Sequence, residues 1–189
     1  MTLAALIAYA YSRPSYEISG GPSWVEKDQF DIDARAPGNE EPSRDDIREM
    51  MRALLTERFN LKSHEETRSM PVFALILSKK GLKMKPGQPS APQKYMLSGG
   101  RMTLIQSTNS PLQLLVNSLL YSAGRPILDQ TGLTGGFDYK LEFSPSSQPD
   151  PVGLSLFSAL EEQLGLKLEP AKAPVSVLVI DEAAHPSRN

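Results

Sequence analysis

LLTERFNLK at residues 54–62 and ALEEQLGLK at 159–167 share one pattern of apolar and acidic positions, and a proline-led apolar stretch follows each. These stretches are PVFALILS at 71–78 and PVSVLVID at 174–181, both rich in residues that favour strands. Apolar residues at helical spacing predict a helix, so each half of the chain is expected to contain a helix and then a strand. The agreement indicates an internal duplication.

The repeat extends upstream of these blocks. FDIDA at 30–34 matches FDYKL at 137–141, and the apolar stretch at 2–11 matches the stretch at 110–120. We therefore predict a duplication with a period of roughly 105 residues, which is too long for a solenoid repeat.

The helix that precedes each apolar stretch has recognisable ends. Asn60 and Gly165 occupy the same place in the repeat, and Asn and Gly best tolerate the left-handed conformation that ends many helices. Ser43, with Asp46 three residues later, predicts the start of a helix over 44–59. Its expected buried positions are Ile47, Met50, Met51, Leu54, Leu55 and Phe59.

The second half predicts the order β-α-β-β-α-β, which is the ferredoxin-like pattern of an antiparallel sheet with two helices on one face. The expected strands are 101–107, 125–129, 137–143 and 174–181, and the expected helices are 110–121 and 154–165. Ser110 is the expected N-cap of the first helix, with Pro111 at its first position.

The first half predicts the same order without its first strand. Its expected elements are a helix at 2–11, strands near 16–19 and 29–34, the helix at 44–59 and the strand at 71–78. Nothing before Thr2 corresponds to residues 101–107, so either the native chain begins earlier or the first sheet has an open edge. An open edge is a pairing site for a partner or for a second copy.

The expected fold class is therefore α+β, with two tandem ferredoxin-like (β-α-β-β-α-β) repeats with antiparallel sheets, the first lacking its leading strand. The predicted domains are a first repeat at 1–80 and a second repeat at 99–189, joined by a linker at 81–98.

The composition argues against several classes of protein. Forty per cent of the residues are hydrophobic, which is enough for a core, and the net charge of -2 gives no general attraction to nucleic acid or anionic lipid. The absence of cysteine removes disulfides and zinc-thiolate sites. Residues 1–11 are apolar but too short to span a bilayer, and they lack the basic start of a signal peptide. We expect no nucleic-acid partner and no membrane insertion of this chain.

Several motifs resemble the soil-associated bacterial protein family, a domain of unknown function. They include YEISGGPSWVEKDQFDIDARAP at 16–37, RPILDQTGLTGGFDYKLEF at 125–143 and SLFSALEEQLGLKLEPAKAPVSVLVID at 155–181. The resemblance implies an exported or membrane-anchored protein, in some members behind a beta-lactam-sensor-type membrane peptidase domain, and it implies no established activity. Members usually carry an additional N-terminal segment with a leading strand. We therefore expect an extracytoplasmic location in the native context.

The loop within ILDQTGLTGGFDYKLEF, residues 127–143, has two readings. Asp129, Thr131 and three glycines suit a tight turn, whereas glycine-rich backbone also binds anions. A strand pattern follows where a phosphate loop needs a helix, which favours the turn. The aromatic residues Phe137, Tyr139 and Phe143 alternate as in RNA-binding sheets, but core packing is favoured because Ile32 and Ala34 replace two residues of that face in the first repeat.

No catalytic constellation is recognisable. HEETR at 64–68 begins like a zinc-protease motif but has Arg68 where the second ligand must be. His64 and His185 are the only histidines, so a histidine-based metal site has at most two imidazole ligands. We predict that the protein is not an enzyme and that it has no cofactor and no metal.

The favoured hypothesis is a non-catalytic binding module that contacts a protein or peptide, or a second copy, through a sheet edge or the cleft between repeats. The alternative is an enzyme or small-ligand binder with a site between the repeats, formed by Trp24, Arg125, Asp129 and Thr131. RNA binding is a weaker alternative. Trp24 is the only tryptophan, and its connection is long where the second repeat has a tight glycine turn.

Overall fold

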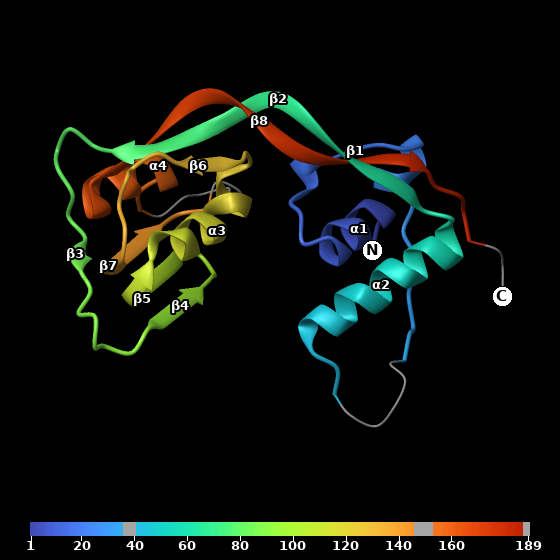
Figure 1. Ribbon diagram of the computed structural model, residues 1–189, viewed down its shortest axis with the longest axis horizontal. Coiled ribbons are helices and arrows are strands. Elements are labelled where there is room, and N and C mark those ends of the chain that lie inside the picture. The colour runs from blue at the N-terminus through green and yellow to red at the C-terminus, as the bar shows by residue number, and fades with distance from the viewer. Residues whose placement is uncertain (36–40, 146–152, 187–189) are drawn as a thin grey trace. The chain divides into compact units, whose positions relative to one another are not determined.

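The structure is a computed structural model that describes residues 1–35, 41–145 and 153–186 (Figure 1). Helices and strands are mixed along the chain, which confirms the α+β class. The chain divides into two compact units: unit 1 comprises Met1–Ser69 and Pro174–Asn189, and unit 2 comprises Met70–Ala173. Each unit has its own hydrophobic core.

Unit 1 contains two helices that pack on each other and on the halves of two long strands. Its elements are α1 (Leu3–Ala10), the 3-10 helices η1 (Ser15–Glu17) and η2 (Ser23–Glu26), β1 (Ile18–Gly20), α2 (Arg44–Phe59), the first half of β2 (Lys62–Leu77) and the second half of β8 (Leu166–Glu182).

Unit 2 contains an antiparallel sheet with helices beside it. Its elements are β3 (Lys85–Pro86), β4 (Lys94–Ser98), β5 (Thr103–Pro111), α3 (Leu112–Ala123), β6 (Ile127–Asp129), β7 (Gly136–Phe143), α4 (Leu156–Ala159), the π-helical turn η3 (Leu160–Leu164) and the remaining halves of β2 and β8.

Among the described residues, the strands form two sheets, with the orders β1-β8-β2-β6 and β3-β7-β5-β4. β1 is parallel to β8, and β6 is parallel to β2. β7 is antiparallel to β3 and to β5, and β4 is antiparallel to β5. The two parallel pairs differ from the antiparallel sheets that were expected, and the tandem ferredoxin-like topology stays a prediction.

The segment at 81–98 contains more structure than a linker would. It carries β3 and β4, and β4 pairs with β5 along its whole length. The Tyr95 hydroxyl group also lies 2.6 Å from the Ser118 hydroxyl group of α3, and it donates a hydrogen bond to the Leu114 carbonyl group. Sequence periodicity missed β4 because its apolar residues Met96 and Leu97 are exposed at the edge of the sheet.

The helix ends follow the local signals closely. Ser43 and Asp46 form a capping box at the start of α2, and Asn60 ends the helix in the left-handed conformation, with φ of 47°. Gly165 ends η3 in the same way, with φ of 70°. The prediction that Ser110 caps α3 was wrong: Ser110 belongs to β5, and its hydroxyl group donates to the Lys94 carbonyl group.

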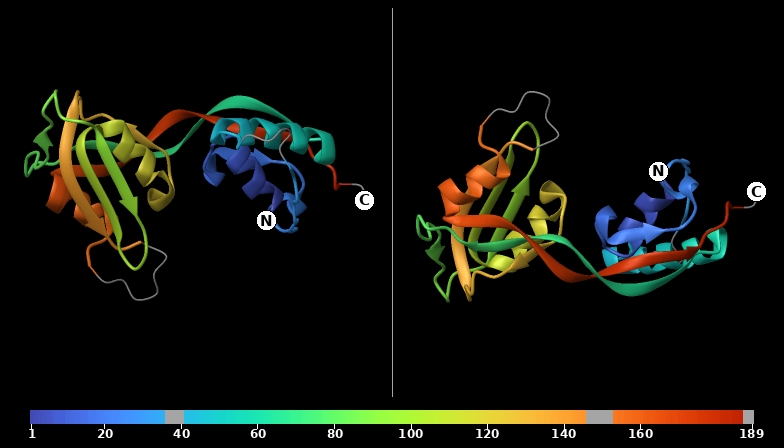
Figure 2. Two further views of the ribbon diagram at one scale, coloured as in Figure 1. Left: turned by 90° about the horizontal axis from the view of Figure 1, so that it is seen from below. Right: turned by 90° about the horizontal axis from the view of Figure 1, so that it is seen from above.

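β2 and β8 lie side by side and both pass from one unit to the other (Figure 2). β2 follows α2 of unit 1, yet its second half supplies Phe73 and Leu75 to the core of unit 2. β8 follows η3 of unit 2, and its second half supplies Leu178 and Ile180 to the core of unit 1. The compact units therefore exchange strand halves and do not coincide with the sequence segments 1–80 and 99–189.

Candidate functional site

The four residues proposed for a shared site lie in different units. Trp24 is part of η2 in unit 1, whereas Arg125, Asp129 and Thr131 belong to unit 2. The Arg125 guanidinium group lies over the Phe73 ring, 5.3 Å from its centroid. The structure therefore brings Trp24 into no common unit with the other three.

The loop after β6 has the hydrogen bonds of a tight turn. The Asp129 carboxylate accepts from the backbone N–H and from the hydroxyl group of Thr131, at 2.9 and 2.7 Å. The Thr131 hydroxyl oxygen in turn accepts from the backbone N–H of Leu133. The polar atoms that suggested a ligand loop are thus engaged with their own backbone, in agreement with the turn interpretation.

The aromatic residues of β7 are part of the unit 2 core. Phe137, Tyr139 and Phe143 have exposed fractions of 5%, 7% and 1%, so their faces are covered by neighbouring side chains. Burial raises the pKa of the Tyr139 hydroxyl group, and the nearby Tyr95 raises it further. The burial of these side chains confirms the core-packing interpretation of this strand.

Trp24 anchors a loop of unit 1. Its ring centroid lies 4.0 Å from that of His185 and 6.1 Å from that of Phe30. The His185 imidazole Nε2 lies 2.9 Å from the Asp28 carboxylate. The His64 imidazole also lies beside a carboxylate, with its Nδ1 2.8 Å from the Asp181 carboxylate. Among the described residues, no group of three or more metal-binding side chains is found.

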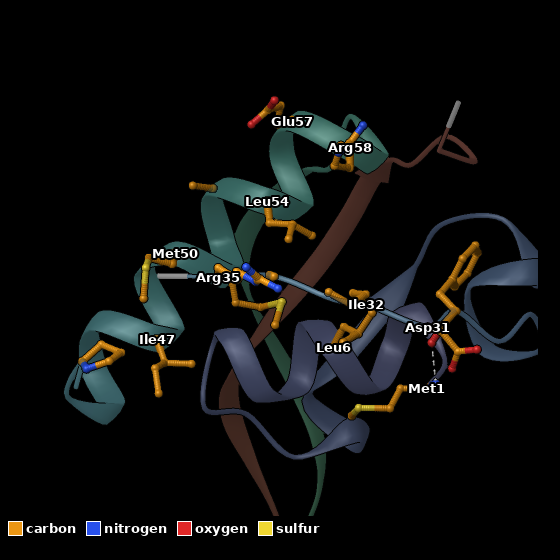
Figure 3. A pocket seen from close by; sticks show the side chains of 15 residues that line it. Met1, Leu6, Asp31, Ile32, Arg35, Ile47, Met50, Leu54, Glu57 and Arg58 are labelled. Atoms are coloured by element: carbon orange, nitrogen blue, oxygen red, sulfur yellow. Dashed lines mark hydrogen bonds between the residues drawn. The ribbon is translucent and has the colours of Figure 1, made fainter. Parts of the chain in front are cut away.

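A hollow of about 860 Å³ lies within unit 1, and we call it the groove (Figure 3). Its lining comes from Met1 and Leu6, from residues in segment 30–35 and from one face of α2. Figure 3 shows Leu54 on α2 and Ile32 on segment 30–35 as neighbouring apolar walls, whereas Glu57 points away from them. The apolar stretch of α2 was visible in the sequence, but the groove itself was not predicted.

The groove exists because one face of α2 is incompletely covered. Leu55 and Phe59 are buried, with exposed fractions of 0% and 3%. The other four positions expected to be buried are only half-buried, namely Ile47, Met50, Met51 and Leu54. In unit 2 the matching helix positions Leu156 and Ala159, which correspond to Met51 and Leu54, are fully buried in the core. Unit 1 thus lacks, among its described residues, the cover that unit 2 provides.

The backbone beside the groove begins a strand pair and then leaves it unpaired. Met1 and Phe30 exchange two backbone hydrogen bonds, each of 2.8 Å, and Thr2 bridges to Gln29. Beyond this point, no backbone hydrogen bond to residues 31–35 comes from any described part of the chain. The strand predicted at 29–34 is therefore reduced to one bridge, since a strand forms only when a neighbour supplies its hydrogen bonds.

In unit 2 the same type of pairing joins β5 to β7. Ser110 lies opposite Phe137 and Pro111 lies opposite Gly136, which matches the pairing of Met1 and Thr2 with Phe30 and Gln29. From there β5 passes an irregularity between Ser107 and Ser110 and then pairs with β7 as far as Thr103, which lies opposite Phe143. In unit 2, β5 therefore occupies the position beside β7 that corresponds to the position beside residues 31–35 in unit 1.

Charged side chains lie along segment 30–35. Asp31, Asp33 and Arg35 are exposed, and within the described residues none of them has an ion-pair partner. Figure 3 shows the Arg35 side chain between α2 and Ile32, and Arg35 is one of the residues that line the groove. The site thus combines an apolar floor, unpaired backbone groups and charges of both signs.

The chain was compared with known families and proteins. A family described as a protein of unknown function (DUF3738) matches residues 4–183. No curated protein and no solved structure matches. In the described part of the chain, no helix is both long enough and apolar enough to cross a membrane.

Proposed function

We propose that this chain, which belongs to the DUF3738 family of proteins of unknown function, is a binding module that holds an extended segment of another polypeptide in the groove of unit 1. The segment would run antiparallel to residues 30–35 and would add a strand beside them. One observation carries the proposal: the pairing that starts β5 against β7 in unit 2 is also started in unit 1, by Met1 and Phe30, and no described residue extends it along residues 31–35.

The groove offers both contributions that strand addition needs. The backbone groups of residues 31–35, to which no described residue is hydrogen-bonded, supply hydrogen bonds, each contributing about 0.5–1.5 kcal/mol net. The half-exposed side chains Ile32, Met51 and Leu54 supply apolar surface, whose burial contributes roughly 25 cal/mol per Å². Ordering a free peptide opposes both contributions, so we expect dissociation constants on the order of 1–100 μM.

The first peptide to test copies β5, because β5 occupies the corresponding place in unit 2. A labelled peptide with the sequence TLIQSTN, residues 103–109, is titrated with the full chain and followed by fluorescence anisotropy. We expect saturable binding. The same peptide with proline in place of the central glutamine should bind at least tenfold more weakly, because proline removes a backbone donor and disfavours regular pairing.

Two variants locate the binding. Leu54→Ala removes part of the apolar wall and should weaken binding about threefold or more. Tyr121→Ala is the matched control, because Tyr121 is 76% exposed and belongs to unit 2. Equal affinities in the two variants would place the peptide elsewhere and would contradict the proposal.

A fusion variant tests directly whether the peptide binds beside residues 31–35. Fusing TLIQSTN immediately before Met1 supplies the strand in cis, so the fused chain should no longer bind the free peptide. Sedimentation of the unfused chain without peptide tests the other occupant. A concentration-dependent dimer that Leu54→Asp dissolves would assign the groove to a second copy and would overturn the proposal.

A further inference from the structure

The side chains of residues 33–35 also indicate the sequence of a peptide that could pair with this segment. We infer that the bound segment carries, in the order of its chain, an acidic residue opposite Arg35, a bulky apolar residue opposite Ala34 and a basic residue opposite Asp33. This inference rests on the proposed function and adds the chemical class of the partner.

The register of the bound segment against residues 30–35 follows from one residue pair that has a counterpart in each unit. Phe30 corresponds to Phe137, because Met1 pairs with the one as Ser110 pairs with the other. Counting onward along both strands makes Ala34 the counterpart of Leu141. In unit 2, Leu141 lies opposite Ile105 of β5. The residue opposite Ala34 would thus take the place of Ile105.

The neighbouring positions follow by the same count. Asp33 corresponds to Lys140, which lies opposite Gln106, and Arg35 corresponds to Glu142, which lies opposite Leu104. In the unpaired segment Arg35 lines the groove, whereas Asp33 does not. Because side chains alternate across a strand, the residues paired with Asp33 and Arg35 would lie on the opposite face from the residue paired with Ala34. In unit 2 this face is the more exposed one: Gln106 is exposed, whereas Ile105 has an exposed fraction of 0%.

The apolar residue of the segment should be large. Unit 1 has Ile32 and Ala34 where unit 2 has Tyr139 and Leu141, so the segment that lines the groove has the smaller side chains. Met51 and Leu54 face the same space from α2 and remain half-buried. A leucine or a larger side chain opposite Ala34 would cover them, as close packing requires.

The charged residues of the segment follow from Asp33 and Arg35. Opposite charges directly across an antiparallel pair are favourable, and like charges are unfavourable. Neither Asp33 nor Arg35 has an ion-pair partner among the described residues. A basic residue opposite Asp33 and an acidic residue opposite Arg35 would pair with both.

Two peptides of identical composition test the order. The forward peptide is acetyl-Ser-Glu-Leu-Lys-Val-Ser-amide, and the reversed peptide exchanges its Glu and Lys. We expect the full chain to bind the forward peptide about five- to twentyfold more tightly at low salt. The preference should shrink in high salt because exposed charges are screened. It should invert in the double variant Asp33→Lys, Arg35→Glu, in which both charges are exchanged.

The outcomes separate the two proposals. If both peptides bind equally and the double variant changes nothing, the charge order is wrong while strand addition stands. If neither peptide binds and TLIQSTN does not bind either, the proposed function is wrong and this inference falls with it. Loss of forward-peptide binding when its leucine is replaced by alanine is expected, and unchanged binding would contradict the apolar position.

Discussion

Gly165 has two structural roles, of which the sequence predicts only one. The sequence predicts a helix end that tolerates a left-handed residue, and φ is indeed 70°. The structure adds a close approach, because a Cβ atom at this position would overlap with the carbonyl oxygen of Gly81. Backbone from a distant part of the chain therefore makes glycine necessary here, which a local pattern does not reveal.

We predict that Gly165→Ala destabilises the protein clearly more than Gly124→Ala does. Gly124 ends α3 with φ of 66°, but nothing lies within 4 Å of the place that a Cβ atom would take there. Both variants bear the left-handed cost of about 1–2 kcal/mol, and the Gly165 variant bears a further 1–3 kcal/mol or so for overpacking. Urea unfolding of both variants measures the difference, and equal losses would show that the Gly81 contact is not retained.

At the scale of the element, α2 shows what a helix pattern can predict. Its bounds, its capping box and its Asn60 end follow from neighbouring residues, and all were predicted correctly. Its burial was predicted less well, because Ile47, Met50, Met51 and Leu54 are only half-buried. An apolar face on a helix indicates that other apolar residues should pack against it, but it does not indicate whether the fold provides them.

The capping box of α2 makes its first turn sensitive to acid. Hydrogen bonds from the Ser43 side chain and then from the Ser43 backbone hold the pKa of the Asp46 carboxyl group below its ordinary value of 3.8. A carboxylate whose pKa is lowered by folding stabilises the fold above the unfolded pKa and loses this contribution as the pH falls through the folded pKa.

We therefore predict that the first turn of α2 loosens below about pH 4. Backbone chemical shifts of residues 44–48, followed by NMR from pH 7 to pH 2, measure the change. Asp46→Asn should remove the pH-dependent part of the response, because the amide does not titrate in this range. A variant that titrates like the wild-type chain would show that another group is responsible.

At the scale of the whole molecule, strand exchange couples the two units. The sequence assigns residues 71–78 to the first half and residues 174–181 to the second half. In the structure, Leu75 belongs to the core of unit 2, and Ile180 belongs to the core of unit 1. Each unit is thus completed by a strand that follows the last helix of the other unit.

The exchange predicts where core substitutions act. Ile180→Ala should reduce amide protection in α1 and α2, and Leu75→Ala should reduce it in α3, each at a cost of about 2–5 kcal/mol. Hydrogen exchange followed by mass spectrometry on the full chain distinguishes the units. The reverse pattern, in which Ile180→Ala affects α3 and Leu75→Ala affects α2, would mean that each strand packs within its own sequence half.

The features that the linear chain specified are those that depend on near neighbours: the helices at 3–10 and 44–59, the turn at Asp129 and Thr131, and the strand character of 71–78 and 174–181. Two features came only from folding, namely the unit that each long strand completes and the pairing of β4. The sequence predicted an open edge in the first repeat, and the structure adds its position, since within the described residues no backbone hydrogen bond reaches residues 31–35. Helices and turns satisfy their hydrogen bonds within a few residues. A strand needs a partner from elsewhere in the chain, so its place depends on which neighbour is free to pair with it.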